Sequence, residues 1–248
     1  MNSDDMTGEF SWFDRDQKER DYIQRLLLRE IFRNADEGIV FKGGTALQKV
    51  YGLERFSDDL DFTINDKESI LQIDEALDAF STNVCEVVND YESERIVSRD
   101  RTVYRMGILH PESKSMRTVT VDITQRGTSI KPDTASVSIG GDSFLVYVMQ
   151  RKEILAEKVR AIYDTQRNKA RDLYDLWFLI RNNIDIDVSL ISKKLKEVGK
   201  VRYSLATFTK RVNLLQGGWD DLGPLMEKLP DYKIAAAEVL DKFRNLEL

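Results

Sequence analysis

The spacing of hydrophobic residues changes near residue 150, and this change divides the chain into two parts. In residues 14–33 apolar side chains recur every three or four positions, which predicts an amphipathic helix. Between residues 95 and 148 apolar and polar positions tend to alternate, which is typical of strands with one buried face. After residue 150 the helical spacing returns. The pattern therefore predicts an α+β domain, residues 1–150, followed by an α-helical domain, residues 151–248.

Within the first domain, shorter segments show strand or helix signals on both sides of a glycine pair. A buried strand is expected at residues 39–41, and a short helix at 45–51. Further strands or helices are expected at 59–64, 67–88, 101–110, 116–124 and 144–148. Residues 101–110 and 116–124 form an antiparallel pair, so the expected sheet is mixed or antiparallel. In the second domain, helices are expected at 151–163, 170–181, 188–197, 203–215 and 232–246.

Composition restricts the chemistry that is available to this chain. Of its 248 residues 42% are hydrophobic, which is enough for a packed core. A single cysteine and a single histidine exclude an internal disulfide and a Cys/His zinc site within one chain. No apolar run is long enough to span a membrane, and the polar, acidic first residues do not resemble a signal peptide, so we expect a cytoplasmic protein. Any metal site must use carboxylates, which favours magnesium.

The net charge of −6 conceals two regions of opposite sign. Residues 54–78 contain nine acidic and two basic side chains, whereas residues 193–211 contain seven basic and one acidic. A basic region in an acidic protein could contact the phosphates of RNA. The candidate RNA contacts are Lys193, Lys194, Lys196, Lys200, Arg202, Lys210 and Arg211. Charges on a helix are more often simply solvated, so the sequence leaves both interpretations open.

A glycine pair and an acidic strand form the most informative part of the sequence. Gly43 and Gly44 lie between a strand and a helix, where backbone N–H groups could approach a phosphate and Thr45 could add a hydroxyl. Strand alternation places Asp59 and Asp61 on one face. Two like charges on one face repel each other, and a bound cation would relieve that repulsion. Each feature alone is usually a simple turn or a solvated strand end, so only their combination favours a functional site.

This combination resembles the first motif of the AbiEii/AbiGii toxin family, which consists of nucleotidyltransferases of the polymerase-β superfamily. The family pattern has a Gly-Gly-Thr/Ser turn ahead of an Arg-x-Ser-x-Asp-Ile/Leu-Asp strand. The sequence matches it at residues 43–45 and again from Arg55 through Ser57 to Asp61. The resemblance covers roughly residues 41–176 and implies a polymerase-β-like nucleotidyltransferase core.

The resemblance also implies a centre of three carboxylates that binds two magnesium ions. Asp59 and Asp61 would be two of these ligands. Asp122 is the third candidate, because it lies in the predicted strand 116–124 on the face opposite the apolar residues. An aspartate at such a position is an ordinary exposed residue about as often as it is a ligand, so its assignment depends on the upstream motif.

Two later segments resemble further motifs of the family. Residues 157–158 match its Glu-Lys pair, and residues 171–172 match its Arg-Asp pair. By this resemblance Lys158 would contact the nucleotide, Arg171 would assist it, and Asp172 would be the later essential aspartate. We expect a Lys158→Ala substitution to abolish turnover with little effect on folding.

The function implied by the resemblance is that of a toxin in a toxin–antitoxin or phage-defence pair. The enzyme would transfer a nucleoside monophosphate from an NTP to the 3′ end of tRNA, and Ser57 would join the glycine turn in nucleotide binding. A cognate antitoxin would be its protein partner, and no membrane is expected to be involved. Two alternatives stay open: transfer to a protein or a small molecule, and a non-catalytic module that binds a nucleotide or a partner.

Overall fold

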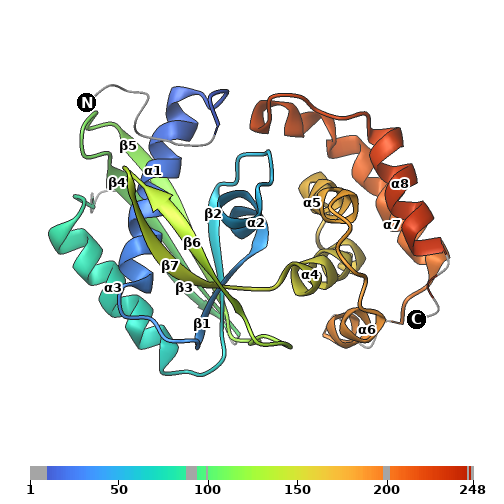
Figure 1. Cartoon of the computed structure of the whole chain (residues 1–248), viewed down its shortest axis with the longest axis horizontal. Coiled ribbons are helices and arrows are strands. Elements are labelled where there is room, and N and C mark those ends of the chain that lie inside the picture. The colour runs from blue at the N-terminus through green and yellow to red at the C-terminus, as the bar shows by residue number, and fades with distance from the viewer. Residues whose placement is uncertain (1–9, 88–93, 99, 198–201, 245, 247–248) are drawn as a thin grey trace. The chain divides into compact units, whose positions relative to one another are not determined.

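The computed structural model describes residues 10–87, 94–98, 100–197, 202–244 and 246. The chain divides into two compact units, Met1–Met149 and Gln150–Leu248. Figure 1 shows both units.

The first unit combines helices with one mixed sheet. Its helices are α1 (Arg15–Phe32), α2 (Gly43–Tyr51) and α3 (Ser69–Asn83). Its strands are β1 (Ile39–Lys42), β2 (Asp59–Ile64), β3 (Glu94–Ser98), β4 (Arg101–Leu109), β5 (Met116–Thr124), β6 (Asp133–Ile139) and β7 (Asp142–Val148). Within the described residues these strands form a sheet in the order β3-β4-β5-β2-β1-β7-β6. The pairs β2–β5 and β1–β7 are parallel and the others antiparallel, which confirms the predicted mixed sheet.

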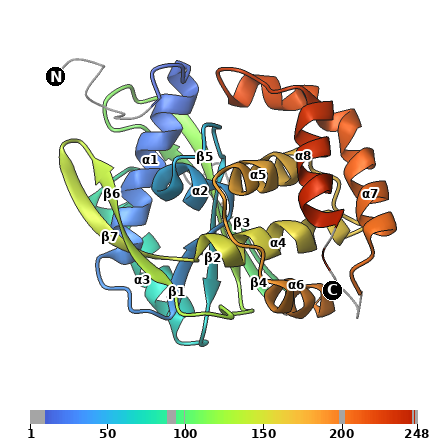
Figure 2. The same ribbon diagram turned by 45° about the vertical axis from the view of Figure 1, so that its right-hand side comes forward.

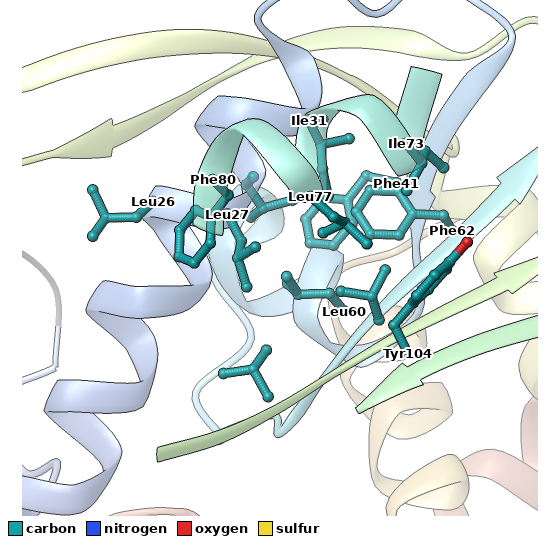
Figure 3. Close-up of a cluster of buried hydrophobic side chains, with 14 of the residues drawn as sticks. Leu26, Leu27, Ile31, Phe41, Leu60, Phe62, Ile73, Leu77, Phe80 and Tyr104 are labelled. Carbon is teal, nitrogen blue, oxygen red and sulfur yellow. The ribbon is translucent and has the colours of Figure 1, made fainter. Parts of the chain in front are cut away.

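The hydrophobic core of this unit lies between the sheet and helices α1 and α3. Figure 3 shows Leu27 of α1 and Phe80 of α3 packed near Leu60 and Phe62 of β2, and all four side chains are fully buried. Because successive side chains of a strand point to opposite faces, this packing turns Asp59 and Asp61 away from the core. The burial of two apolar residues thus fixes the direction of the two acidic ones.

Several boundaries differ from the sequence-based expectations, two of them in helices α2 and α3. Helix α3 ends at Asn83, so the expected helix is wrong over residues 84–87, and residue 88 lies outside the described residues. The chain leaves the helix because Val87 instead forms a β-bridge with Ile108 of β4. Helix α2 begins at Gly43, so the glycine pair forms its first turn and does not precede it.

The second unit is helical in its described part, as predicted. Its α-helices are α4 (Arg151–Tyr163), α5 (Ala170–Arg181), α6 (Val188–Lys196), α7 (Leu205–Leu214) and α8 (Tyr232–Arg244), with 3₁₀ turns at Leu215–Gly218 and Asp220–Leu225. Helices α7 and α8 lie side by side, as Figures 1 and 2 both show. Tyr163, Phe208 and Phe243 form an aromatic core within this unit. No helix among the described residues is long and apolar enough to cross a membrane.

Candidate active site

The three predicted carboxylates lie on neighbouring strands of the sheet. Asp61 is directly opposite Asp122 of the parallel strand β5, and Asp59 is opposite Thr120 of the same strand. On its other side Asp61 is opposite Lys42 of β1. Residues in register on adjacent strands share a face, so Lys42, Asp61 and Asp122 form one row across three strands. The strand register therefore brings together residues from three separate parts of the sequence.

Asp122 is already engaged by a side chain from the next strand. Arg101 of β4 donates to both oxygens of the Asp122 carboxylate, from Nε to Oδ1 at 2.9 Å and from Nη2 to Oδ2 at 2.6 Å. Carboxylate oxygens are suitable magnesium ligands. Within the described residues, however, no three His, Cys, Asp or Glu side chains are already grouped to hold a metal ion. The donor chemistry fits magnesium, and an ion bound at Asp122 would share the carboxylate oxygens with Arg101 or displace it.

Lys42 is a charged residue of this face that the sequence-based prediction missed. Its side chain lies on the acidic face, is 8% exposed and donates from Nζ to Thr124 Oγ1 at 2.8 Å. A buried ammonium opposite Asp61 offsets part of the negative charge of the row. The only signal in the sequence is a lysine that ends an otherwise apolar strand just before the glycine pair.

Neighbouring side chains occupy the space that a Cβ would need at Gly43 and Gly44. Gly43 has φ of +77°, and a Cβ at this position would collide with the carboxylate of Asp61. A Cβ on Gly44 would collide with the guanidinium of Arg55 and would lie 3.0 Å from Ser57 Oγ. Only glycine tolerates both the backbone angle and these close approaches. Phosphate binding by the backbone N–H groups of this turn stays a prediction.

Thr45 and Ser57 are both buried in this structure. The Thr45 hydroxyl is fully buried and donates to the backbone carbonyl of Asp59. The expectation that it donates to a phosphate is therefore wrong for this conformation, because the hydroxyl instead fastens α2 to the start of β2. Ser57 is 5% exposed and its N–H is bonded within the fold, so its part in nucleotide binding stays a prediction.

In the second unit, Lys158 and Asp172 form the centre of a buried charge cluster. Lys158 Nζ lies 3.0 Å from Asp172 Oδ1 and 2.6 Å from Asp175 Oδ2. Arg167 Nε lies 2.6 Å from Asp172 Oδ2. Arg171 is half-buried in the first turn of α5. The structure thus brings Lys158 and Asp172 together and adds two partners that the motif comparison did not assign.

Burial acts to raise the pKa of Asp172, but Lys158 and Arg167 together lower it well below its ordinary range. Removal of Lys158 would leave two buried carboxylates with less compensation. The structure therefore predicts that Lys158→Ala also destabilises the fold, in contrast to the sequence-based expectation of little effect on folding.

The predicted RNA contacts do not share one environment. Lys194 is 1% exposed, and its Nζ lies 2.9 Å from Glu153 Oε1 and 2.8 Å from Glu157 Oε1. Burial acts to lower the pKa of Lys194, but these two carboxylates raise it above its usual value. The expectation that Lys194 contacts RNA is wrong, because its charge is used inside the unit.

Arg211 is also used within its unit. It donates to the backbone carbonyls of Ile162, Asp164 and Arg167, and it is only partly exposed. The exposed members of the predicted set are Lys193, Lys196, Arg202 and Lys210. Lys200 lies outside the described residues.

Comparisons with solved structures show the architecture, and a family model shows the family. The crystal structure of JHP933 from Helicobacter pylori superposes with a TM-score of 0.62 at 22% identity, covering 94% of this chain and 92% of that one. A protein from the same organism, provisionally described as a nucleotidyltransferase, gives a TM-score of 0.62 at 23% identity, covering 95% of this chain and 100% of that one. Both show the same fold, whereas no curated protein sequence matches. The family model described as "Nucleotidyl transferase AbiEii toxin, Type IV TA system" matches residues 25–242, so this chain belongs to that family.

Proposed function

We propose that this protein transfers a nucleoside monophosphate from an NTP to the 3′ end of a tRNA and so blocks translation in the cytoplasm. Membership of the AbiEii family supports a nucleotidyl transferase that acts as a toxin and has an antitoxin partner. The observation that carries the proposal is the row of Asp61 and Asp122 on adjacent parallel strands, with Asp59 on the same face. Gly43 lies against the carboxylate of Asp61, so the turn and the acidic row form one site.

In the proposed reaction, the 3′ hydroxyl oxygen of the acceptor forms a bond to the α-phosphorus of the NTP. The bond to the β-phosphate oxygen breaks, pyrophosphate leaves, and the proton of the hydroxyl passes to solvent water. Asp59, Asp61 and Asp122 would hold magnesium, which when bound supplies positive charge for the phosphate oxygens and a lower pKa for the attacking hydroxyl. The N–H groups of Gly43 and Gly44 would orient the phosphates.

The proposed acceptor is supported by exposed positive charge in the second unit. Lys193, Lys196, Arg202 and Lys210 are exposed in a protein whose net charge is −6. Lysine and arginine contacts to phosphates provide affinity without base specificity. We therefore expect tRNA to be bound mainly through its backbone and shape.

The test is a transfer assay with the full chain, each labelled NTP in turn, magnesium and total tRNA. We expect label at the tRNA 3′ end with the wild type and none with Asp59→Asn or Asp61→Asn. Asp58→Asn is the matched control, because Asp58 precedes β2, pairs with Arg20 at 3.2 Å and is not part of the proposed ligand set. Its activity should stay close to that of the wild type.

A parallel reaction replaces the tRNA with a protein and metabolite extract. Label found only in that reaction would show that the protein is a transferase whose acceptor is a protein or a small molecule and not tRNA. Nucleotide binding without transfer to any acceptor would contradict the proposed enzymatic activity and favour a non-catalytic binding module.

A further inference from the structure

Two buried glutamines hold the backbone just before the acidic strand. Gln24 of α1 donates from Nε2 to the carbonyls of Ser57 at 3.0 Å and Asp58 at 2.7 Å. Gln48 of α2 accepts at Oε1 from the Ser57 N–H at 3.0 Å. Both glutamines are fully buried. Side chains of two helices therefore bind the backbone of Ser57, and that of α1 also binds the backbone of Asp58.

Residues 57 and 58 need such partners because they lie outside the sheet. Strand β2 begins at Asp59, so the ladder with β1 and β5 does not include Ser57 or Asp58. Buried backbone groups without a partner cost free energy, and here the two amide side chains replace the missing ladder bonds. Thr45 of α2 binds the next residue in the same way, by donating to the backbone carbonyl of Asp59.

A buried carboxylate fixes the orientation of one of these amides. Asp21 of α1 accepts from Gln48 Nε2 at 3.1 Å, from Lys49 Nζ at 2.6 Å and from Arg25 Nε at 2.6 Å. Because the amide nitrogen of Gln48 faces Asp21, its oxygen is the atom presented to Ser57. Burial acts to raise the pKa of Asp21, but Lys49 and Arg25 lower it, so the carboxylate stays ionised as an acceptor.

The geometry points to Gln24 and Gln48 as positioning residues for Asp59 and Asp61. A strand that slips by one residue moves every side chain to the other face, which here would bury the acidic pair and expose Leu60 and Phe62. The glutamines bind the N–H and the carbonyl of Ser57 and the carbonyl of Asp58. These bonds fix which side chains of β2 face the core and which face away from it. An apolar side chain at position 24 or 48 would fill the space without fixing the register of the strand. The role in catalysis rests on the proposed function, whereas the hold on the backbone does not.

The test compares Gln24→Met and Gln48→Met with Ile23→Val in the full chain. Methionine keeps the approximate volume but removes the amide, and Ile23→Val is a mild core change in α1 that leaves both amides in place. Four quantities are measured: hydrogen exchange of residues 57–61, Mn²⁺ affinity without nucleotide, and kcat and KM for the NTP. We expect exchange about tenfold faster, Mn²⁺ affinity about tenfold weaker and kcat lower, with KM nearly unchanged, because the lost hydrogen bonds no longer hold the start of β2 in place. Ile23→Val leaves both amides in place, so Mn²⁺ affinity, kcat and KM should stay within about twofold of the wild type.

Gln24→Leu is a second variant that removes the amide bound to the carbonyls of Ser57 and Asp58. It should show the same faster exchange and weaker Mn²⁺ affinity even if Gln48→Met folds poorly. The proposal is overturned if exchange and Mn²⁺ affinity of both methionine variants match those of Ile23→Val. If the wild type transfers nothing while the methionine variants still exchange faster and bind Mn²⁺ more weakly, the proposed function fails and the hold on the acidic strand stands.

Discussion

Asp61 and Asp122 are paired directly across the parallel strands β2 and β5, so two carboxylates share one row of the sheet. Like charges directly opposite each other destabilise a sheet. The chain places a positive charge at each end of this row, Lys42 opposite Asp61 and Arg101 on Asp122. The pair therefore contributes little to stability by itself, and we expect a bound cation to stabilise it.

Asp61→Asn should remove this repulsion. In EDTA we expect the variant to be as stable as the wild type or more stable by about 0.2–1 kcal/mol, while transfer activity is lost. Magnesium should raise the Tm of the wild type and have a much smaller effect on the variant. Thermal unfolding with and without magnesium measures both effects. A variant that is strongly destabilised in EDTA would show that Asp61 serves the fold.

Lys158→Ala should destabilise the second unit by about 3–5 kcal/mol, because it leaves Asp172 and Asp175 buried with less compensation. Lys169→Ala is the matched control, since Lys169 is exposed just before α5 and should change stability by less than about 0.5 kcal/mol. Urea unfolding followed by tryptophan fluorescence measures the difference. Equal stability of the two variants would contradict the buried cluster.

Acid should weaken the same cluster. The pKa of Asp172 is lowered by folding from its ordinary 3.8, so its contribution to stability is fully present above that value and is lost as the pH falls below it. The free energy of unfolding should therefore decline more steeply below about pH 4 in the wild type than in Asp172→Asn. Urea unfolding between pH 2 and pH 6, in steps of about half a unit, compares the two slopes. Parallel curves would rule out this contribution.

Three lysines of α6 should respond differently to neutralisation. Lys193→Gln and Lys196→Gln should weaken tRNA binding and make it less dependent on salt, because both side chains are exposed. Lys194→Gln should instead lower stability, because it breaks the buried bonds to Glu153 and Glu157. Filter binding at several salt concentrations and urea unfolding separate the two effects. Loss of stability in Lys193→Gln would contradict the assigned exposures.

Local periodicity was sufficient to predict most of the secondary structure and the face of β2 that carries the acidic pair. Leu60 and Phe62 alternate with Asp59 and Asp61, and burial of the first pair in the core determines the direction of the second. The helices after residue 150 follow in the same way from their apolar spacing. Family membership was also predictable, because it depends on short motifs whose residues are close in sequence.

The partners of each charge were decided only by tertiary structure. The row of Lys42, Asp61 and Asp122 depends on the order and register of three strands, which no local pattern encodes. Lys193 and Lys194 are neighbours in a basic run, yet they lie on different faces of α6. Lys193 is exposed, whereas Lys194 is buried against Glu153. Gln24 and Gln48 are ordinary helix residues in the sequence, and their hold on Ser57 requires α1 and α2 to meet the start of β2. Burial and pairing are set by contacts between distant segments, so they follow from the fold and not from the spacing of residues along the chain.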